Sequence, residues 1–123
     1  MKPEDKELLL KDLCARLPYG IKASYYGADE ECETWDEVDG IAFCYVEIGQ
    51  YSLPIERIKP YLFPMSSMTE EQKNEYQYIT ERWMNDSSYS ISDSIDWLNA
   101  HHFDYRNLIN KNLSIDCTNL NIY

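Results

Sequence analysis

Apolar positions near the start of the chain recur with the spacing of a helix. Pro3 suits a first helical position, and acidic residues follow it at the positive end of the helix dipole. Pro18 ends the helix, because the residue before a proline is displaced from the α region. We therefore predict a helix from Pro3 to Leu17. Its apolar face has i, i+3, i+4, i+7 spacing and consists of Leu10, Leu13, Cys14 and Leu17.

The next apolar runs are typical of strands. The segments "IKASYY" (21–26) and "IAFCYVEI" (41–48) are rich in β-branched and aromatic residues. A shorter run, "YSLPIERI" (51–58), follows a turn at Gly49-Gln50. Pro54 removes one backbone donor, which predicts an edge strand. We expect a small antiparallel sheet of about three strands.

Two prolines then bracket an aromatic segment. Because Pro60 and Pro64 argue against a regular helix or a central strand, we expect residues 59–67 to cross from the sheet to the helices in an extended, polyproline-like conformation. Thr69 and Gln72 match a capping box, with Ser67 and Glu70 as an overlapping alternative. Either pair predicts that a helix begins here.

The second half of the chain predicts two helices and an irregular tail. The first helix carries Tyr76, Ile79 and Trp83 on one face. The second helix has its own apolar face, formed by Ile91, Ile95 and Leu98. Asparagines after residue 106 favour turns and left-handed backbone, and "LSIDC" (113–117) alternates like a short strand. The pattern as a whole predicts an α+β fold in a single domain, residues 1–123.

Charge narrows the range of partners. The chain holds 22 acidic and 11 basic residues, for a net charge of −11. Such a chain is repelled by phosphate groups, and no cluster of Lys and Arg offsets the repulsion. We therefore expect neither direct nucleic-acid binding nor binding to an anionic membrane. A protein partner with a basic surface stays open.

Seven of the acidic residues lie in one segment, between Gly27 and Gly40. A calcium loop is one interpretation, but its spacing fails because Thr34 stands where the sixth position requires glycine. A solvated hairpin loop is the other interpretation, with contact to a basic partner as its functional form. The acidic residues of this predicted loop are Asp29, Glu30, Glu31, Glu33, Asp36, Glu37 and Asp39.

Signals for catalysis or cofactor binding are weak. The four cysteines form no C-x-x-C pair, and the start "MKPEDKELLL" is unlike a signal peptide, so we expect a reduced, cytoplasmic protein. No phosphate loop or nucleophile elbow occurs, and we predict no cofactor and no metal. His101 and His102 are adjacent, so their side chains diverge on a helix. A small hydrolase or ligand-binding domain that uses these histidines and Asp104 is one open hypothesis.

Two aromatic segments are candidates for a contact surface. Tyr61 and Phe63 lie on the proline-flanked crossing. The run "HHFDYR" adds aromatic and arginine groups, which are enriched at interface hot spots. The structural alternative is that Asp104 and Arg106 form a local ion pair at a helix end. The candidate interaction residues are Tyr61, Phe63, Phe103, Asp104, Tyr105 and Arg106.

Four motifs together carry a resemblance to a known family. The segments "LLLKDLCARLPYG", "IKPYLFPMSSMTEEQ", "IDWLN" and "HHFDYRNLI" resemble a family of small proteins, without an established biochemical role, encoded in gut Bacteroides and their phages or mobile elements. Members of that family have glycine, proline and glycine where this chain has Asn107, Asn110 and Asn112. Asparagine tolerates positive φ better than any other residue except glycine, so we expect turns at the two glycine positions.

These observations leave three hypotheses for function. The first is a non-catalytic cytoplasmic protein that binds another protein; the resemblance implies a modulator of host machinery. The second is an acidic decoy in which Asp29 to Asp39 engage a basic, DNA-binding protein. The third is the hydrolase or ligand-binding domain at His101, His102 and Asp104.

Overall fold

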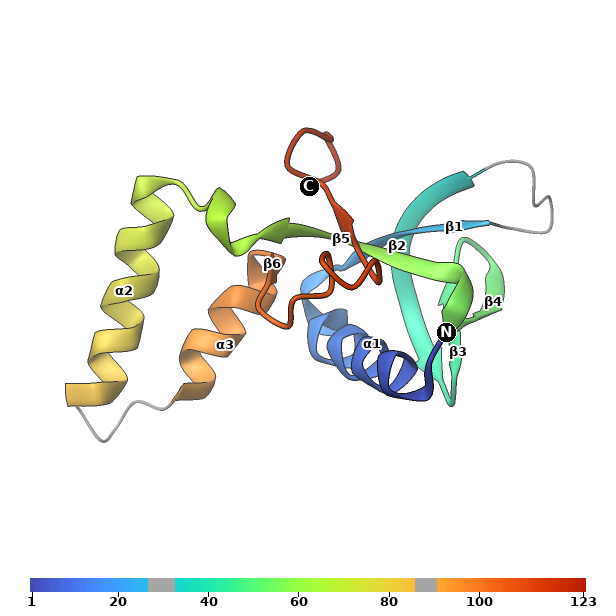
Figure 1. The fold of residues 1–123 in the computed structure, drawn as a ribbon, viewed down its shortest axis with the longest axis horizontal. Coiled ribbons are helices and arrows are strands. Elements are labelled where there is room, and N and C mark those ends of the chain that lie inside the picture. Colours follow the sequence, from blue (N-terminus) through green and yellow to red (C-terminus); the bar gives the residue numbers. More distant parts are fainter. Residues whose placement is uncertain (27–32, 86–90) are drawn as a thin grey trace.

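The computed structural model describes the backbone of residues 1–26, 33–85 and 91–123, and the side chains of 1–26, 34–82 and 92–123. Along these residues, helix α1 is followed by five strands, two further α-helices and two short strands (Figure 1). Their bounds are α1 (Pro3–Arg16), β1 (Lys22–Tyr26), β2 (Glu33–Ala42), β3 (Tyr45–Ile48), β4 (Tyr51–Pro54), β5 (Ile58–Pro64), α2 (Glu70–Asn85), α3 (Ile91–Ala100), β6 (Phe103–Asp104) and β7 (Ile115–Asp116).

The strands form one mixed sheet in the order β4-β3-β2-β1-β5-β6, with β7 also paired to β5. The α+β class is therefore correct, but the expected antiparallel sheet of about three strands is wrong. The segment 41–48 contains the end of one strand, a two-residue turn and a second strand. Residues 33–39, expected in a loop, belong to β2. Two short strands near the C-terminus add parallel pairings to β5.

The proline-flanked segment is a central strand, contrary to expectation. Strand β5 pairs with β1 in antiparallel fashion and with β6 and β7 in parallel fashion. Proline keeps an extended backbone and removes only its own N–H donor. The parallel pairings are held by hydrogen bonds at residues other than proline, from the Phe63 amide to the His102 carbonyl at 2.8 Å and from the Cys117 amide to the Leu62 carbonyl at 3.0 Å.

The main core lies between α1 and one face of the sheet. Helix α1 buries Leu9 and Leu13, but it also buries Asp12 and Arg16, and Cys14 is exposed. The predicted apolar face is confirmed at Leu13, which is buried, and at Leu10 and Leu17, which pack against the core, but it is wrong at Cys14. Buried polar partners also draw Asp12 and Arg16 inward. The core cluster consists of Leu9, Leu13, Ile21, Ala23, Tyr25, Val38, Val46, Ile48, Leu53, Ile55, Ile58, Leu62, Leu108 and Leu113.

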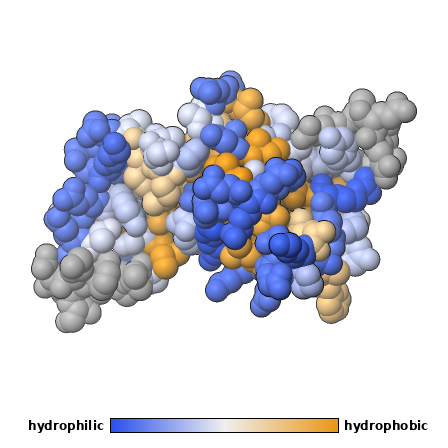
Figure 2. All heavy atoms as spheres, viewed as in Figure 1, coloured by the Kyte–Doolittle hydropathy of each residue, from blue (hydrophilic) through white to orange (hydrophobic). Residues whose placement is uncertain are grey.

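Helices α2 and α3 lie side by side at the opposite end of the molecule from β3 and β4 (Figure 1). A second cluster of Met68, Trp97, Leu98 and Phe103 joins them to the end of β5, with Tyr76 and Ile79 packed against it. Trp83 was predicted to share this apolar face of α2, but its side chain lies outside the described residues. Hydrophilic residues cover most of α1 and the outer side of α2 in Figure 2.

Several local predictions are confirmed. Gly49 and Gln50 form the β3–β4 turn with φ values of 56° and 71°, and β4 is an edge strand. The capping box is present, since Thr69 and Gln72 exchange side-chain to backbone hydrogen bonds at 2.9 and 3.1 Å. Among the described residues, no helix has the length and apolar character to cross a membrane.

Candidate functional site

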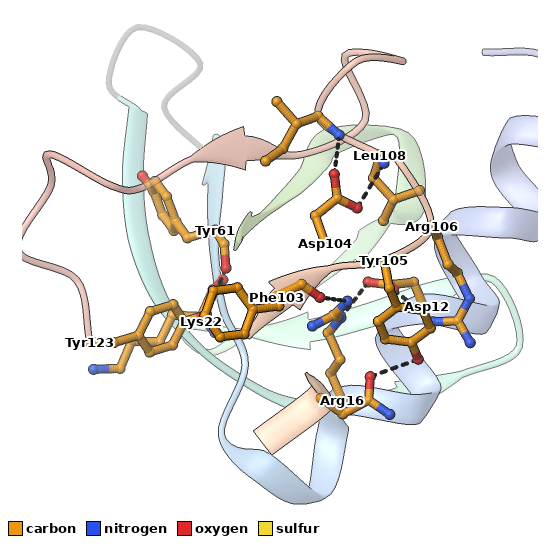
Figure 3. Close-up of polar contacts among 12 residues, drawn as sticks. Asp12, Arg16, Lys22, Tyr61, Phe103, Asp104, Tyr105, Arg106, Leu108 and Tyr123 are labelled. Atoms are coloured by element: carbon orange, nitrogen blue, oxygen red, sulfur yellow. Dashed lines mark hydrogen bonds and ion pairs between the residues drawn. The ribbon is translucent and has the colours of Figure 1, made fainter. Parts of the chain in front are cut away.

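The predicted contact segment Phe103–Arg106 lies at a junction inside the molecule. Phe103 and Asp104 form β6 and are only 2% and 7% exposed. Arg16 of α1 donates a hydrogen bond from Nη2 to the Phe103 carbonyl at 2.6 Å (Figure 3). Two residues of the expected surface therefore offer almost no area to a partner.

A buried charge cluster holds this junction together. Asp12 accepts from Arg16 Nε at 2.9 Å with one carboxylate oxygen and from Arg106 Nη1 at 2.8 Å with the other. The Tyr105 ring lies within 5.2 Å of the Arg16 guanidinium carbon and within 4.6 Å of the Arg106 one. Two cations thus share one carboxylate and one ring, an arrangement that aligns α1 with the segment after α3. Sequence reasoning missed Asp12 and Arg16, although their i, i+4 spacing was a signal.

Asp104 does not pair with Arg106, so the predicted local ion pair is wrong. Its carboxylate accepts from the backbone amides of Leu108 and Ile109 at 2.8 and 3.0 Å. The side chain therefore closes the turn that follows β6, while Arg106 extends to Asp12. Asp104 and Arg106 therefore both form contacts within the fold.

Tyr61 and Phe63 lie under the C-terminal segment. Tyr61 is 7% exposed, and its carbonyl accepts a hydrogen bond from the Tyr123 hydroxyl at 2.9 Å. The same hydroxyl accepts from the Lys22 amide at 2.9 Å, and burial raises the pKa of Tyr123 above its usual value. The ring of Phe63 lies 6.0 Å from that of Tyr123. These aromatic residues fasten the end of the chain to β1 and β5.

His101, His102 and Asp104 have separate surroundings. His101 stacks on Trp97 at 4.1 Å, and His102 stacks on Tyr123 at 3.7 Å. Burial, together with the charges of Arg16, His101 and Lys22, lowers the pKa of His102 to about 4. Asp104 is engaged by two backbone amides, as described above. No three His, Cys, Asp or Glu side chains within the described residues converge as metal ligands.

The buried cysteine is not a good candidate for a nucleophile. Cys117 is fully buried, and burial raises its pKa to about 11. A thiol with so high a pKa is protonated at neutral pH and is a poor nucleophile. Cys14, expected on an apolar face, is exposed, and so is Cys44.

The acidic residues lie partly on strand β2. Asp29, Glu30 and Glu31 fall outside the described residues, and Glu33 begins β2. Asp36, Glu37 and Asp39 are exposed on that strand, with Glu37 opposite Lys22 of β1. These charges are therefore held on a fixed backbone.

A surface that no prediction named lies where β2, β3 and β4 meet. Its exposed aromatic residues are Phe43 at 95%, Tyr45 at 46% and Tyr51 at 39%. Asp39 and Glu47 are also exposed on these strands, and they line a shallow hollow of about 300 Å³ with Tyr51, at the other end of β3 from Phe43. We call these five residues the hairpin surface. Its aromatic residues were passed over because the segment 41–48 was interpreted as one continuous strand.

Comparison of the chain with protein-family models, with curated proteins and with solved structures finds no match.

Proposed function

We propose that the chain is a non-catalytic, cytoplasmic protein that binds another protein through the hairpin surface. In line with the family resemblance, the partner is a component of a host cell whose activity the chain modulates. The observation that carries the proposal is the exposure of Phe43, Tyr45 and Tyr51 on strands and turns that also expose the carboxylates of Asp39 and Glu47. Aromatic groups of this kind are enriched at interface hot spots.

The distribution of polar groups supports binding over catalysis. The described histidines stack on aromatic rings, and Asp12, Asp104 and Arg106 serve the internal junction. A general acid or base must reach a substrate proton, whereas His101 stacks on Trp97, His102 stacks on Tyr123 and Asp104 accepts from two backbone amides. Their contacts favour a scaffold that supports a surface elsewhere.

A second candidate is the acidic decoy for a basic, DNA-binding protein. The observation that favours it is the exposure of Asp36, Glu37 and Asp39 along β2 in a chain of net charge −11. Binding of that kind is dominated by exposed charges, which salt screens within about 8 Å at physiological ionic strength. The two candidates therefore differ in their salt dependence.

The test is affinity capture from host lysate with stepwise salt elution, read by mass spectrometry. Wild type is compared with an aromatic variant, Phe43→Ser/Tyr45→Ser, and an acid-neutral variant, Asp36→Asn/Glu37→Gln/Asp39→Asn. Tyr78→Ser is the matched control, because Tyr78 is an aromatic residue 58% exposed on α2, which lies at the opposite end of the molecule from β3 and β4 (Figure 1).

A partner that resists high salt and is lost with the aromatic variant supports the proposed function. A partner that elutes at modest salt and needs the acids supports the decoy instead. Absence of any specific partner would contradict both candidates. Loss of capture with Tyr78→Ser would show that the binding surface is elsewhere.

A further inference from the structure

Phe43 is the most exposed large apolar side chain among the described residues. It is 95% exposed, and the next, Tyr78, is 58% exposed. A tyrosine keeps a hydroxyl for water, whereas phenylalanine has no polar group to satisfy in solvent. Phe43 makes no contribution to any of the three buried clusters. The fold therefore does not account for this side chain.

The backbone at Phe43 is also unfavourable for its residue type. Phe43 and Cys44 form the two-residue turn between β2 and β3, flanked by the pair Ala42 and Tyr45. Phe43 has a φ of 57°, a conformation that is rare for bulky residues and is usually supplied by glycine or asparagine. The β3–β4 turn starts with Gly49, at a φ of 56°. One turn thus uses the expected residue and the other uses phenylalanine.

The turn is held firmly enough to present that ring in one place. The Ile55 amide donates to the Cys44 carbonyl at 3.1 Å, so the chain after β4 closes over the turn. Strand β3, which follows the turn, is anchored by Val46 and Ile48, both fully buried in the main core. A ring carried on such a backbone loses little conformational freedom when it binds.

The charge of the chain indicates which kind of pocket the Phe43 ring would enter. Asp39 and Glu47 are exposed on the same pair of strands, and the chain carries a net charge of −11. A second copy of this chain, or an anionic membrane, would be repelled. A pocket that is apolar inside and carries Lys and Arg at its rim complements both the ring and the carboxylates.

We propose that Phe43 is an anchor residue that inserts into an apolar, basic-rimmed pocket of a partner protein. This inference rests on the proposed function and adds the residue that dominates binding and the chemistry of its receptor. Residues of this kind lie at the centre of interfaces and are surrounded by contacts of little energy.

The first measurement is thermal unfolding of Phe43→Gly beside wild type. Glycine relieves the left-handed conformation and removes the exposed ring, so the melting temperature is expected to be equal or higher. A clear fall in the melting temperature would overturn the inference, because Phe43 would then serve the fold.

The second measurement uses photo-crosslinking in host lysate with p-benzoylphenylalanine at position 43, and at position 78 as the control. The protein crosslinked from position 43 is then purified and its affinity measured for wild type, Phe43→Gly, Phe43→Leu and Tyr78→Ser. We expect crosslinks on apolar residues flanked by Lys or Arg. We also expect a loss of at least about 30-fold for Phe43→Gly, with partial retention for Phe43→Leu and a change within about 3-fold for Tyr78→Ser.

The outcomes separate this inference from the proposed function. A partner that binds through the hairpin surface but tolerates Phe43→Gly overturns the anchor and leaves the proposed function standing. Self-crosslinking with concentration-dependent dimers, or co-sedimentation with phosphatidylcholine vesicles that needs Phe43, assigns the ring to another occupant and overturns the partner pocket. Absence of a partner in both this assay and the salt-elution capture overturns the two together.

Discussion

Arg16 donates a hydrogen bond to the backbone carbonyl of Phe103, 87 residues later in the chain, at 2.6 Å. The two residues are 0% and 2% exposed, so the bond lies in the interior. It fixes the first helix to the strand that follows the last helix. A buried polar contact, in addition to apolar packing, therefore holds α1 against β6.

Substitution Arg16→Met should destabilise the fold by roughly 3–5 kcal/mol. The change keeps most of the side-chain volume but leaves the Phe103 carbonyl with only the Tyr105 amide as donor and Asp12 with Arg106 alone. Urea unfolding followed by circular dichroism measures the loss. Lys73→Met is the matched control, because Lys73 pairs with Glu70 on the surface of α2 and such pairs contribute less than about 1 kcal/mol. A loss below 1 kcal/mol for Arg16→Met would show that the buried cluster is not a principal support of the fold.

Local features of the fold were predictable from the sequence. The turn at Gly49-Gln50, the Thr69–Gln72 capping box and the left-handed Asn107 and Asn112 each depend on residues a few positions apart. Such features can therefore be predicted from short segments of the sequence. The pairing of Asp12 with Arg106 spans 94 residues, and the strands β6 and β7 have only two residues each. Such contacts have no local signature.

The contact residues could not be predicted from the sequence, for the same reason. Sequence reasoning favoured Tyr61 and Phe103 because aromatic residues near prolines and arginine resemble contact residues, but Tyr61 is buried beside the C-terminal segment and Phe103 is buried in the cluster with Trp97. The sequence placed Phe43 within a strand, where successive side chains point to alternate faces of the sheet. Whether an aromatic residue falls in a strand or in a turn depends on the register of its neighbours, and the register is set by the whole sheet.

Gly49→Ala should destabilise the sheet by about 2 kcal/mol or more. A Cβ at this position would overlap the Tyr25 hydroxyl oxygen and lie 2.7 Å from the ring carbon that carries it, and the φ of 56° is strained for alanine. Thermal unfolding of both single variants and of Gly49→Ala/Tyr25→Phe forms a double-mutant cycle. Removal of the hydroxyl should recover part of the loss. Equal losses in the two backgrounds would assign the effect to the backbone alone.

Asn112 tests the turn that the chain builds with asparagine. Its φ is 59°, and its side-chain oxygen accepts from Lys59 Nζ at 3.1 Å on the surface. We expect Asn112→Gly to change the free energy of unfolding by less than about 1 kcal/mol, and Asn112→Val to lower it by about 1–2 kcal/mol. Chemical denaturation at one pH compares them. A tolerated valine would mean that the turn adopts another conformation in solution.

His102 should make the fold less stable in moderately acidic solution. Burial first, and then the charge of Arg16, lowers the pKa of His102 from 6.5 to about 4 in the folded chain. Between these two pH values the unfolded chain binds a proton that the folded chain does not. The free energy of unfolding therefore falls as the pH drops from about 6.5 toward 4, and this group adds no further change below that range.

The variant His102→Asn isolates this contribution. Asparagine tolerates the left-handed φ of 63° at this position and carries no titratable group. Because the half-buried ring is partly screened by solvent, we expect wild type to lose about 1–2 kcal/mol more than the variant between pH 7 and pH 4.5. The carboxylates titrate in both proteins and cancel in the difference. A proton NMR titration gives the midpoint directly, and a value near 6.5 for the His102 ring would mean that its stacking on Tyr123 leaves it open to water.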